Sequence, residues 1–137
     1  MTDPALTVDT VLTDDIREWL TDELRFPVMA VIAPDGKPVQ SVMWFELDAK
    51  LPDTILMNTR VGRAKERFLR RDPRASLCFE DGLTWIALQG VVELDDDRES
   101  SMEDINRLAR RYRSSDTFAG QERVTIRMRV EKVVRHD

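Results

Sequence analysis

The sequence predicts a single, mainly β (α+β) domain: a small barrel of about six antiparallel strands with about three helices. Short apolar or alternating runs recur along the chain, and turn signals such as Asp35-Gly36 and Asp81-Gly82 separate them. Three further segments repeat their apolar residues with helical spacing. Strands joined by hairpins pair antiparallel, and such a set is typical of a small barrel. With 137 residues the chain can bury one core but not two.

The first half of the domain is predicted to contain one helix followed by three strands. Residues 1–12 are expected to form a flexible N-terminal arm, and residues 13–137 the single barrel domain. Thr13 is a candidate cap for a helix that runs to about Leu24 with its apolar residues on one face. Apolar runs and alternating patterns predict the strands that follow. These predicted strands cover residues 26–33, 38–47 and 54–58.

The second half is predicted to contain two helices and the remaining strands. Asp72-Pro73 ends the first of these helices, because the residue before a proline is pushed out of the α region. Asp95, Asp96 and Asp97 open the other, since acidic side chains suit the positive end of a helix. A divalent-cation site is the weaker interpretation of this acidic run, because no spaced set of ligands accompanies it. The helix that follows the acidic run covers residues 98–113, and the strands of this half cover residues 74–80, 83–94 and 122–134.

Composition excludes several classes of function. A balance of 21 basic against 26 acidic residues gives a net charge of −5, which argues against general binding to nucleic acid or to a membrane surface. One histidine and one cysteine exclude the usual zinc sites and the Ser-His-Asp and Cys-His triads. Cys78 is expected to be a buried, inert thiol in a reducing, cytoplasmic compartment. No transmembrane segment or signal peptide is expected.

The segment Met57–Ser76 carries positive charge where a helix normally attracts negative charge. Arg60, Arg63 and Lys65 lie around the expected start of the helix, where unpaired N–H groups and the positive end of the helix dipole favour acids. Each such cation costs roughly 0.3–1 kcal/mol unless an anion sits among them. Gly62 would let the backbone approach a ligand closely. The pattern predicts a phosphate cradle, with a merely basic surface helix as the alternative.

No acid–base machinery accompanies this cradle. The chain contains neither the G-x-G-x-x-G fingerprint nor the Walker P-loop. An enzyme without its own acid and base must take its reactivity from a cofactor. The cradle therefore points to a phosphate-bearing redox coenzyme.

Three segments together resemble the pyridoxamine 5′-phosphate oxidase-like split β-barrel proteins, which bind flavins and deazaflavins. They are PVMAVIAPDGKPVQSVMWFEL from Pro27, RAK from Arg63 and RDPRAS from Arg71. The resemblance runs from about residue 12 to residue 134 and is strongest to the branch that uses coenzyme F-420. It implies a split β-barrel of the FMN-binding type. It also implies a homodimer with two cofactor sites at the subunit interface.

The resemblance also implies roles for individual residues. Lys65 and Arg63 would hold the cofactor phosphate, and the strand around Ser41 would line the ring. Trp85 would cover the ring or the substrate from the partner subunit, or else belong to the core of the interface. Trp44 is expected in the core or on the dimer surface. The implied cofactor-binding residues are Gln40, Ser41, Val42, Met43, Met57, Asn58, Thr59, Arg60, Arg63, Ala64, Lys65 and Trp85.

The function implied is that of an F-420-dependent oxidoreductase. It would transfer hydride from the reduced deazaflavin to a small conjugated acceptor such as a quinone, an enone or a tetrapyrrole. Two alternatives keep the fold: an FMN-dependent oxidase or reductase, and a non-catalytic protein that binds a flavin, a deazaflavin or haem. Pyridoxamine phosphate is not expected as the substrate, because Arg135-His136 lacks the family's surrounding pattern. No metal ligand, catalytic side chain, nucleic-acid partner or membrane partner is expected.

Overall fold

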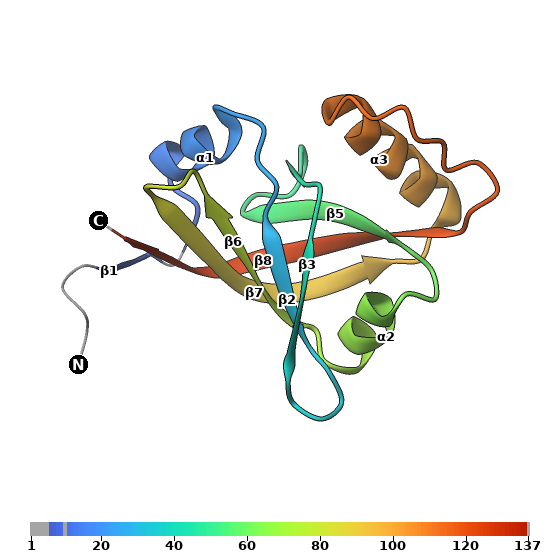
Figure 1. Cartoon of the computed structure of the whole chain (residues 1–137), viewed down its shortest axis with the longest axis horizontal. Helices are drawn as coiled ribbons and strands as arrows, with labels where there is room; N and C mark the ends of the chain where they lie inside the picture. Colours follow the sequence, from blue (N-terminus) through green and yellow to red (C-terminus); the bar gives the residue numbers. More distant parts are fainter. Residues whose placement is uncertain (1–5, 10, 137) are drawn as a thin grey trace.

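The computed structural model describes residues 6–9 and 11–136, which form an antiparallel sheet and helices (Figure 1). In these residues the strands are β1 (Leu6–Asp9), β2 (Val28–Ile32), β3 (Pro38–Val42), β4 (Glu46–Leu47), β5 (Thr54–Arg60), β6 (Arg74–Glu80), β7 (Trp85–Asp95) and β8 (Arg123–His136). The helices of the same residues are α1 (Asp14–Thr21), α2 (Ala64–Arg71) and α3 (Arg98–Arg111). The mainly β class with about three helices is confirmed. The described part contains eight strands where six were predicted.

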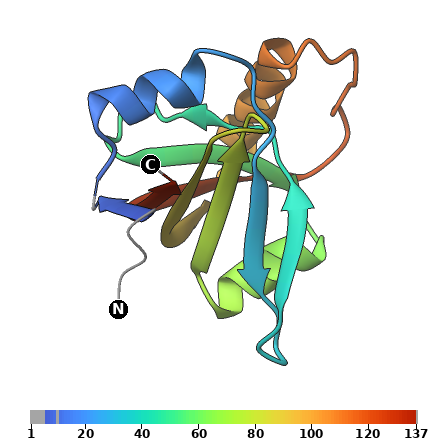
Figure 2. The ribbon, with the colours of Figure 1, turned by 60° about the vertical axis from the view of Figure 1, so that its left-hand side comes forward.

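The sheet curls into a barrel that stays open between two edge strands. Its order is β3-β2-β6-β7-β8-β5-β4, and β1 pairs with β8 outside this path. The hairpin of β2 and β3 crosses in front of β5 and β8 (Figures 1 and 2). Residues 38–47 were predicted to form one strand, but the chain breaks between Val42 and Glu46. Met43 and Phe45 turn into the core there, so the segment crosses from one edge of the sheet to the other.

Strand β5 is buried on both faces. Ile55 and Met57 point into the barrel core, and Leu56 packs against Ile105 and Leu108 of α3. A strand covered by a core on one side and by a helix on the other reads as a continuous apolar run. This explains why the sequence around Thr54–Asn58 does not alternate.

Helices α1 and α2 add residues to the same core. Ile16 and Leu20 of α1 and Leu69 of α2 are almost completely buried. Thr13 is the N-cap of α1 as predicted, but its hydroxyl bonds the Asp15 carboxylate and not the helix backbone. The helix ends at Thr21, before the predicted end near Leu24. No helix in the described part of the chain is long and apolar enough to span a membrane.

Part of the predicted N-terminal arm belongs to the sheet. Residues 6–9 form β1, which pairs antiparallel with residues 133–136 of β8. Leu12 is also buried in the core, at 6% exposure. Residues 1–5 and 10 of the predicted arm lie outside the described residues. The long strand β8 extends past β5, whose pairing ends at Arg129, and the edge left free beyond that point accepts this additional strand.

Cys78 is exposed, which corrects the prediction of a buried thiol. Residues of β6 alternate between the two faces of the sheet, and Leu77 and Phe79 on either side of Cys78 take the inward positions. The thiol therefore points outward. Its partial burial and the neighbouring Glu80 raise the pKa of Cys78.

A β-bulge at Gln89 and Gly90 shifts the register between β7 and β8. Before the bulge Gln89 pairs with Lys132, and after it Gly90 pairs with Val130. The two backbones approach so closely there that a Cβ atom on residue 90 would lie 2.1 Å from the carbonyl oxygen of Arg129. Only glycine fits this position.

We expect Gly90→Ala to destabilise the protein by about 3 kcal/mol or more, because the atom in the way is backbone and cannot rotate aside. Gly82→Ala is the matched control, since that glycine has a φ of 93° but open space around it. The control should lose only about 1–2 kcal/mol. Urea unfolding followed by circular dichroism measures both variants. Equal losses would contradict the close-approach explanation.

Candidate functional site

The candidate site begins where β5 runs into α2. The strand ends at Arg60, which lies opposite Arg123 at the start of β8. The chain then turns through Gly62, whose φ of 94° favours glycine, and Arg63 forms the N-cap of α2. This short turn places a strand end, a helix start and the start of a second strand at one corner of the barrel (Figure 1).

Two backbone N–H groups at the start of α2 are available to a ligand. The Gly62 N–H donates to Oε1 of Glu66 at 2.7 Å, and the Glu66 N–H donates to the Arg63 carbonyl at 3.1 Å. The N–H groups of Ala64 and Lys65 have no protein acceptor within the described ranges. Free N–H groups at a helix start bind anions well.

Four cations surround these N–H groups: Arg60, Arg63, Lys65 and Arg123. We call them the cation cluster. In the part of the chain that the structure describes, none of the four lies within 4.0 Å of a carboxylate oxygen. Burial and the charges of Arg63 and Arg123 lower the pKa of Lys65. Burial and the charges of Arg63 and Arg60 lower the pKa of Arg123 to about 10. The cluster therefore lacks a counter-ion from the protein.

The other arginines of this region have structural roles. Arg70 pairs with Glu66 at 2.7 Å and with Asp96 at 2.6 Å, and Arg74 pairs with Asp72 at 2.8 Å. Arg71 donates to the Pro34 carbonyl, and Arg67 donates to the Gly62 carbonyl. The alternative of a basic surface helix describes these residues well. It does not describe the cation cluster, whose members have no carboxylate partner among the described residues.

Two hollows meet at the cluster and share Thr59, Arg63 and Lys65. The first hollow has a volume of about 270 Å³ and lies toward α3. The second has a volume of about 340 Å³ and lies toward β2 and β3. The first is also lined by Val42, Met43, Trp44, Asn58, Arg60, Ile105, Leu108, Asp116, Phe118 and Arg123. The second is also lined by Val31, Val39, Ser41 and Ala64.

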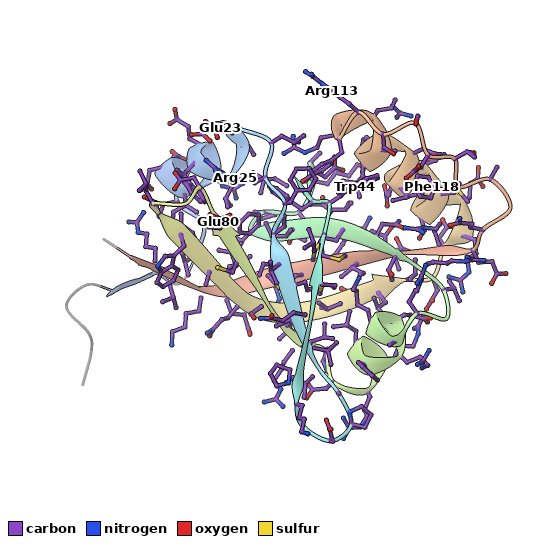
Figure 3. All side chains as sticks on the ribbon, in the orientation of Figure 1. Glu23, Arg25, Trp44, Glu80, Arg113 and Phe118 are labelled. Atoms are coloured by element: carbon purple, nitrogen blue, oxygen red, sulfur yellow. The ribbon has the colours of Figure 1, made fainter. Side chains whose placement is uncertain are left out.

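Aromatic side chains form part of the wall of the first hollow. Trp44 stacks on Tyr112 with ring centres 5.3 Å apart, and Phe118 meets Trp44 edge-on at 6.5 Å. Figure 3 shows Trp44 and Phe118 on the side of the barrel near α3. The Tyr112 hydroxyl accepts a hydrogen bond from the Phe45 N–H at 3.2 Å, which holds this stack beside the break between β3 and β4. Trp44 thus lines the first hollow and also packs against the hydrophobic core, which was one of its two expected positions.

Most of the predicted cofactor-binding residues line the two hollows. Three do not. Gln40 is exposed and lines neither hollow, and Met57 is fully buried in the barrel core. Trp85 lies at the start of β7 and lines neither hollow, whereas the cation cluster lies near the other end of that strand, where Asp95 pairs with Thr125. The nine that line a hollow are Ser41, Val42, Met43, Asn58, Thr59, Arg60, Arg63, Ala64 and Lys65.

Sequence reasoning missed Arg123 and Phe118, together with Asp116 and the α3 residues Ile105 and Leu108. Arg123 begins β8, and only the pairing of β5 with β8 brings it opposite Arg60. The sequence alone does not reveal this pairing. Phe118 lies in the loop between α3 and β8, where no local pattern marks it. These residues join the site through long-range pairing.

The chemistry available to the site is anion binding beside an apolar wall. The described residues contain no group of three or more His, Cys, Asp or Glu side chains that would hold a metal ion. The cations and the free N–H groups suit a phosphate, and the aromatic wall suits a flat, conjugated group.

Comparisons with known proteins agree with this fold. An F420 reductase is 23% identical, with a TM-score of 0.74 over 85% of this chain and 94% of that chain. A conserved hypothetical protein from Mycobacterium tuberculosis is 24% identical, with a TM-score of 0.68 over 94% of this chain and 87% of that one. HupZ of Group A Streptococcus is 15% identical, with a TM-score of 0.66 over 90% and 92%. At these identities the likeness shows the shared fold.

The family comparison covers nearly the whole chain. The family described as pyridoxamine 5′-phosphate oxidase matches residues 12–137. This span includes both strands and the helix that build the cation cluster. The chain therefore belongs to the pyridoxamine 5′-phosphate oxidase family, with the split-barrel fold that its sequence pattern resembles.

Proposed function

We propose that this protein is an F-420-dependent oxidoreductase that reduces a small conjugated acceptor, such as a quinone, an enone or a tetrapyrrole. The observation that carries the proposal is the cation cluster at the start of α2, which has no carboxylate partner among the described residues. The family membership and the fold shared with an F420 reductase support it. The alternative is FMN, since both coenzymes join a three-ring system to a phosphate through a ribityl chain.

The residues present fit the phosphate of such a coenzyme. The N–H groups of Ala64 and Lys65 would bind phosphate oxygens, and the side chains of Arg63 and Lys65 would neutralise their charge. Thr59 lines both hollows beside these groups. When bound, the deazaflavin ring supplies hydride chemistry.

The remaining residues would orient and shield the ligands. Trp44, Phe118 and Leu108 form an apolar wall that excludes water from one side of the first hollow. The single carboxylate that lines either hollow in the described chain, Asp116, is exposed. We therefore assign no general acid or base, and Arg63 and Lys65 act as anchors.

We also propose a homodimer with its cofactor sites at the subunit interface. No helix lies in front of β2 and β3 in the view of Figure 2. Apolar side chains on and beside this hairpin are exposed: Phe26 at 54%, Val39 at 41% and Val42 at 65%. Trp85 is remote from the site of its own chain, and in this proposal it approaches the site of the partner subunit.

Lys65→Ala should raise the dissociation constant of F-420 by about one to two orders of magnitude, because it removes a charge-assisted bond worth about 1.5–3 kcal/mol. Fluorescence titration of the purified protein measures this constant. The control is Lys132→Ala, an exposed lysine on β8 that lines neither hollow. Unchanged affinity in Lys65→Ala would refute the phosphate cradle. Tight FMN binding with weak F-420 binding would select the flavin alternative, and binding without turnover would select a carrier.

Lys65→Gln should stabilise the ligand-free protein at neutral pH, because folding lowers the pKa of Lys65 below its usual 10.5 and so disfavours its charged form. Between the folded-state pKa and 10.5 the unfolded chain binds more protons, so the stability of the wild type rises with pH in that window. The advantage of the variant should therefore shrink as the pH approaches 10.5. Thermal unfolding of the wild type and the variant, at neutral pH and near pH 10.5, tests this. A variant less stable than wild type at neutral pH would contradict it.

Sedimentation should give twice the mass of one chain. Ala30→Asp, on the exposed side of the β2–β3 hairpin, should shift the protein toward monomer, because a dimer interface tolerates an unpaired charge poorly. Ala49→Asp, in the exposed turn after β4, is the matched control and should leave the mass unchanged. A monomeric wild type would disprove the dimer.

A further inference from the structure

We infer that Arg123, with Arg60 beside it, forms a second anion subsite that recognises a carboxylate of the ligand beyond its phosphate. The inference rests on the proposed function, because it concerns the same site. It makes Arg123 a specificity-determining residue that lies outside the α2 segment and is supplied by β8.

The guanidinium of Arg123 is held in place without being neutralised. Its Nε donates to Oδ1 of Asn58 at 2.9 Å, and its Nη1 donates to Oε1 of Gln121 at 3.1 Å. It also lies 4.9 Å from the centre of the Phe118 ring. Asn58 is itself fixed, since its Nδ2 donates to the Ser101 carbonyl at 2.8 Å. All these acceptors are neutral, and Nη2 has no acceptor among the described residues.

Each of the other arginines of β8 has a carboxylate within 4.0 Å. Arg127 pairs with Asp48 at 3.0 Å and with Asp95 at 2.9 Å. Arg135 pairs with Asp15 at 3.0 Å, and Arg129 lies 3.9 Å from Glu131. Arg123 alone among the arginines of β8 has no carboxylate within 4.0 Å in the described chain. A half-buried, fixed guanidinium with only neutral and like-charged neighbours is costly unless a ligand supplies the counter-ion.

The charge of the cluster exceeds that of one phosphate. A phosphate monoester carries about −1.5 to −2 at neutral pH. The four cations of the cluster are opposed by one acid that lines the first hollow in the described chain, the exposed Asp116. At least one positive charge then remains unbalanced. A carboxylate would balance it, and two parallel bonds from Arg123 suit the planar geometry of that group.

The position of the phosphate leaves room for this second group. Thr59, Arg63 and Lys65 are shared by both hollows, so a phosphate held there can extend in both directions. A phosphate diester has two arms and fits this arrangement, whereas a monoester fills only one hollow. An arm that enters the first hollow reaches Arg123. The structure thus favours a ligand built as ring, phosphate and carboxylate-bearing arm.

The test compares two ligands with the same ring and phosphate: F-420 with its lactyl-glutamyl arm, and the deazaflavin ribityl phosphate without that arm. The unmodified protein should bind the complete coenzyme about tenfold more tightly or better. Arg123→Gln should weaken binding of the complete coenzyme about tenfold and change binding of the armless ligand by less than about threefold. Arg129→Gln, which changes an exposed arginine of the same strand, should leave both affinities unchanged.

Four results would overturn the inference. Equal weakening of both ligands by Arg123→Gln would place Arg123 at the phosphate. Equal affinity of the unmodified protein for the two ligands would show that the arm of the coenzyme is not recognised. This comparison needs no variant, so it remains decisive even if Arg123→Gln fails to fold. Failure to bind either ligand would refute the proposed function, and the inference with it. Tight binding of the armless ligand alone would refute only the second subsite.

Discussion

The antiparallel pairing of β5 with β8 sets the geometry on which the site depends. Its register runs from Thr54 opposite Arg129 to Arg60 opposite Arg123. A shift by one residue would exchange the two faces of β5, so that Leu56 would point into the barrel core and Ile55 and Met57 toward α3, and it would separate the two arginines. Because β5 continues directly into α2, the same pairing also fixes the helix start relative to β8. The cation cluster therefore follows from the register of two strands that are far apart in the sequence.

A charge network outside the site keeps the turn before α2 in place. Glu66 accepts the Gly62 N–H and pairs with Arg70, which in turn pairs with Asp96 at the start of the α3 segment. These bonds lower the pKa of Glu66 and keep it charged. The turn is thus tied to a second element by carboxylates that line neither hollow. This arrangement lets the cations remain unneutralised, at a cost in stability that a bound anion would offset.

The opening of the barrel supplies the other half of the site. Because β3 and β4 do not pair, the segment between them leaves the sheet and carries Trp44 to the stack on Tyr112. Helix α3 covers the outer face of β5 and adds the apolar wall. The cations thus come from strand ends and a helix start, and the wall comes from the break in the sheet. A phosphate-bearing aromatic ligand needs both kinds of surface close together.

Local patterns in the sequence determined most of the strands, the helices and three of the four members of the cation cluster. Arg60, Arg63 and Lys65 could be predicted because a helix start and its dipole depend on neighbouring residues alone. Tertiary structure decided the rest. Arg123 reaches Asn58 across 65 positions of sequence, through strand pairing that no local spacing encodes. Likewise, Cys78 is exposed because it lies on the outer face of β6, and Trp85 is far from the site because it lies at the opposite end of β7. Residue type and spacing specify elements, whereas contacts between distant residues depend on register, and register is set only when the whole barrel closes.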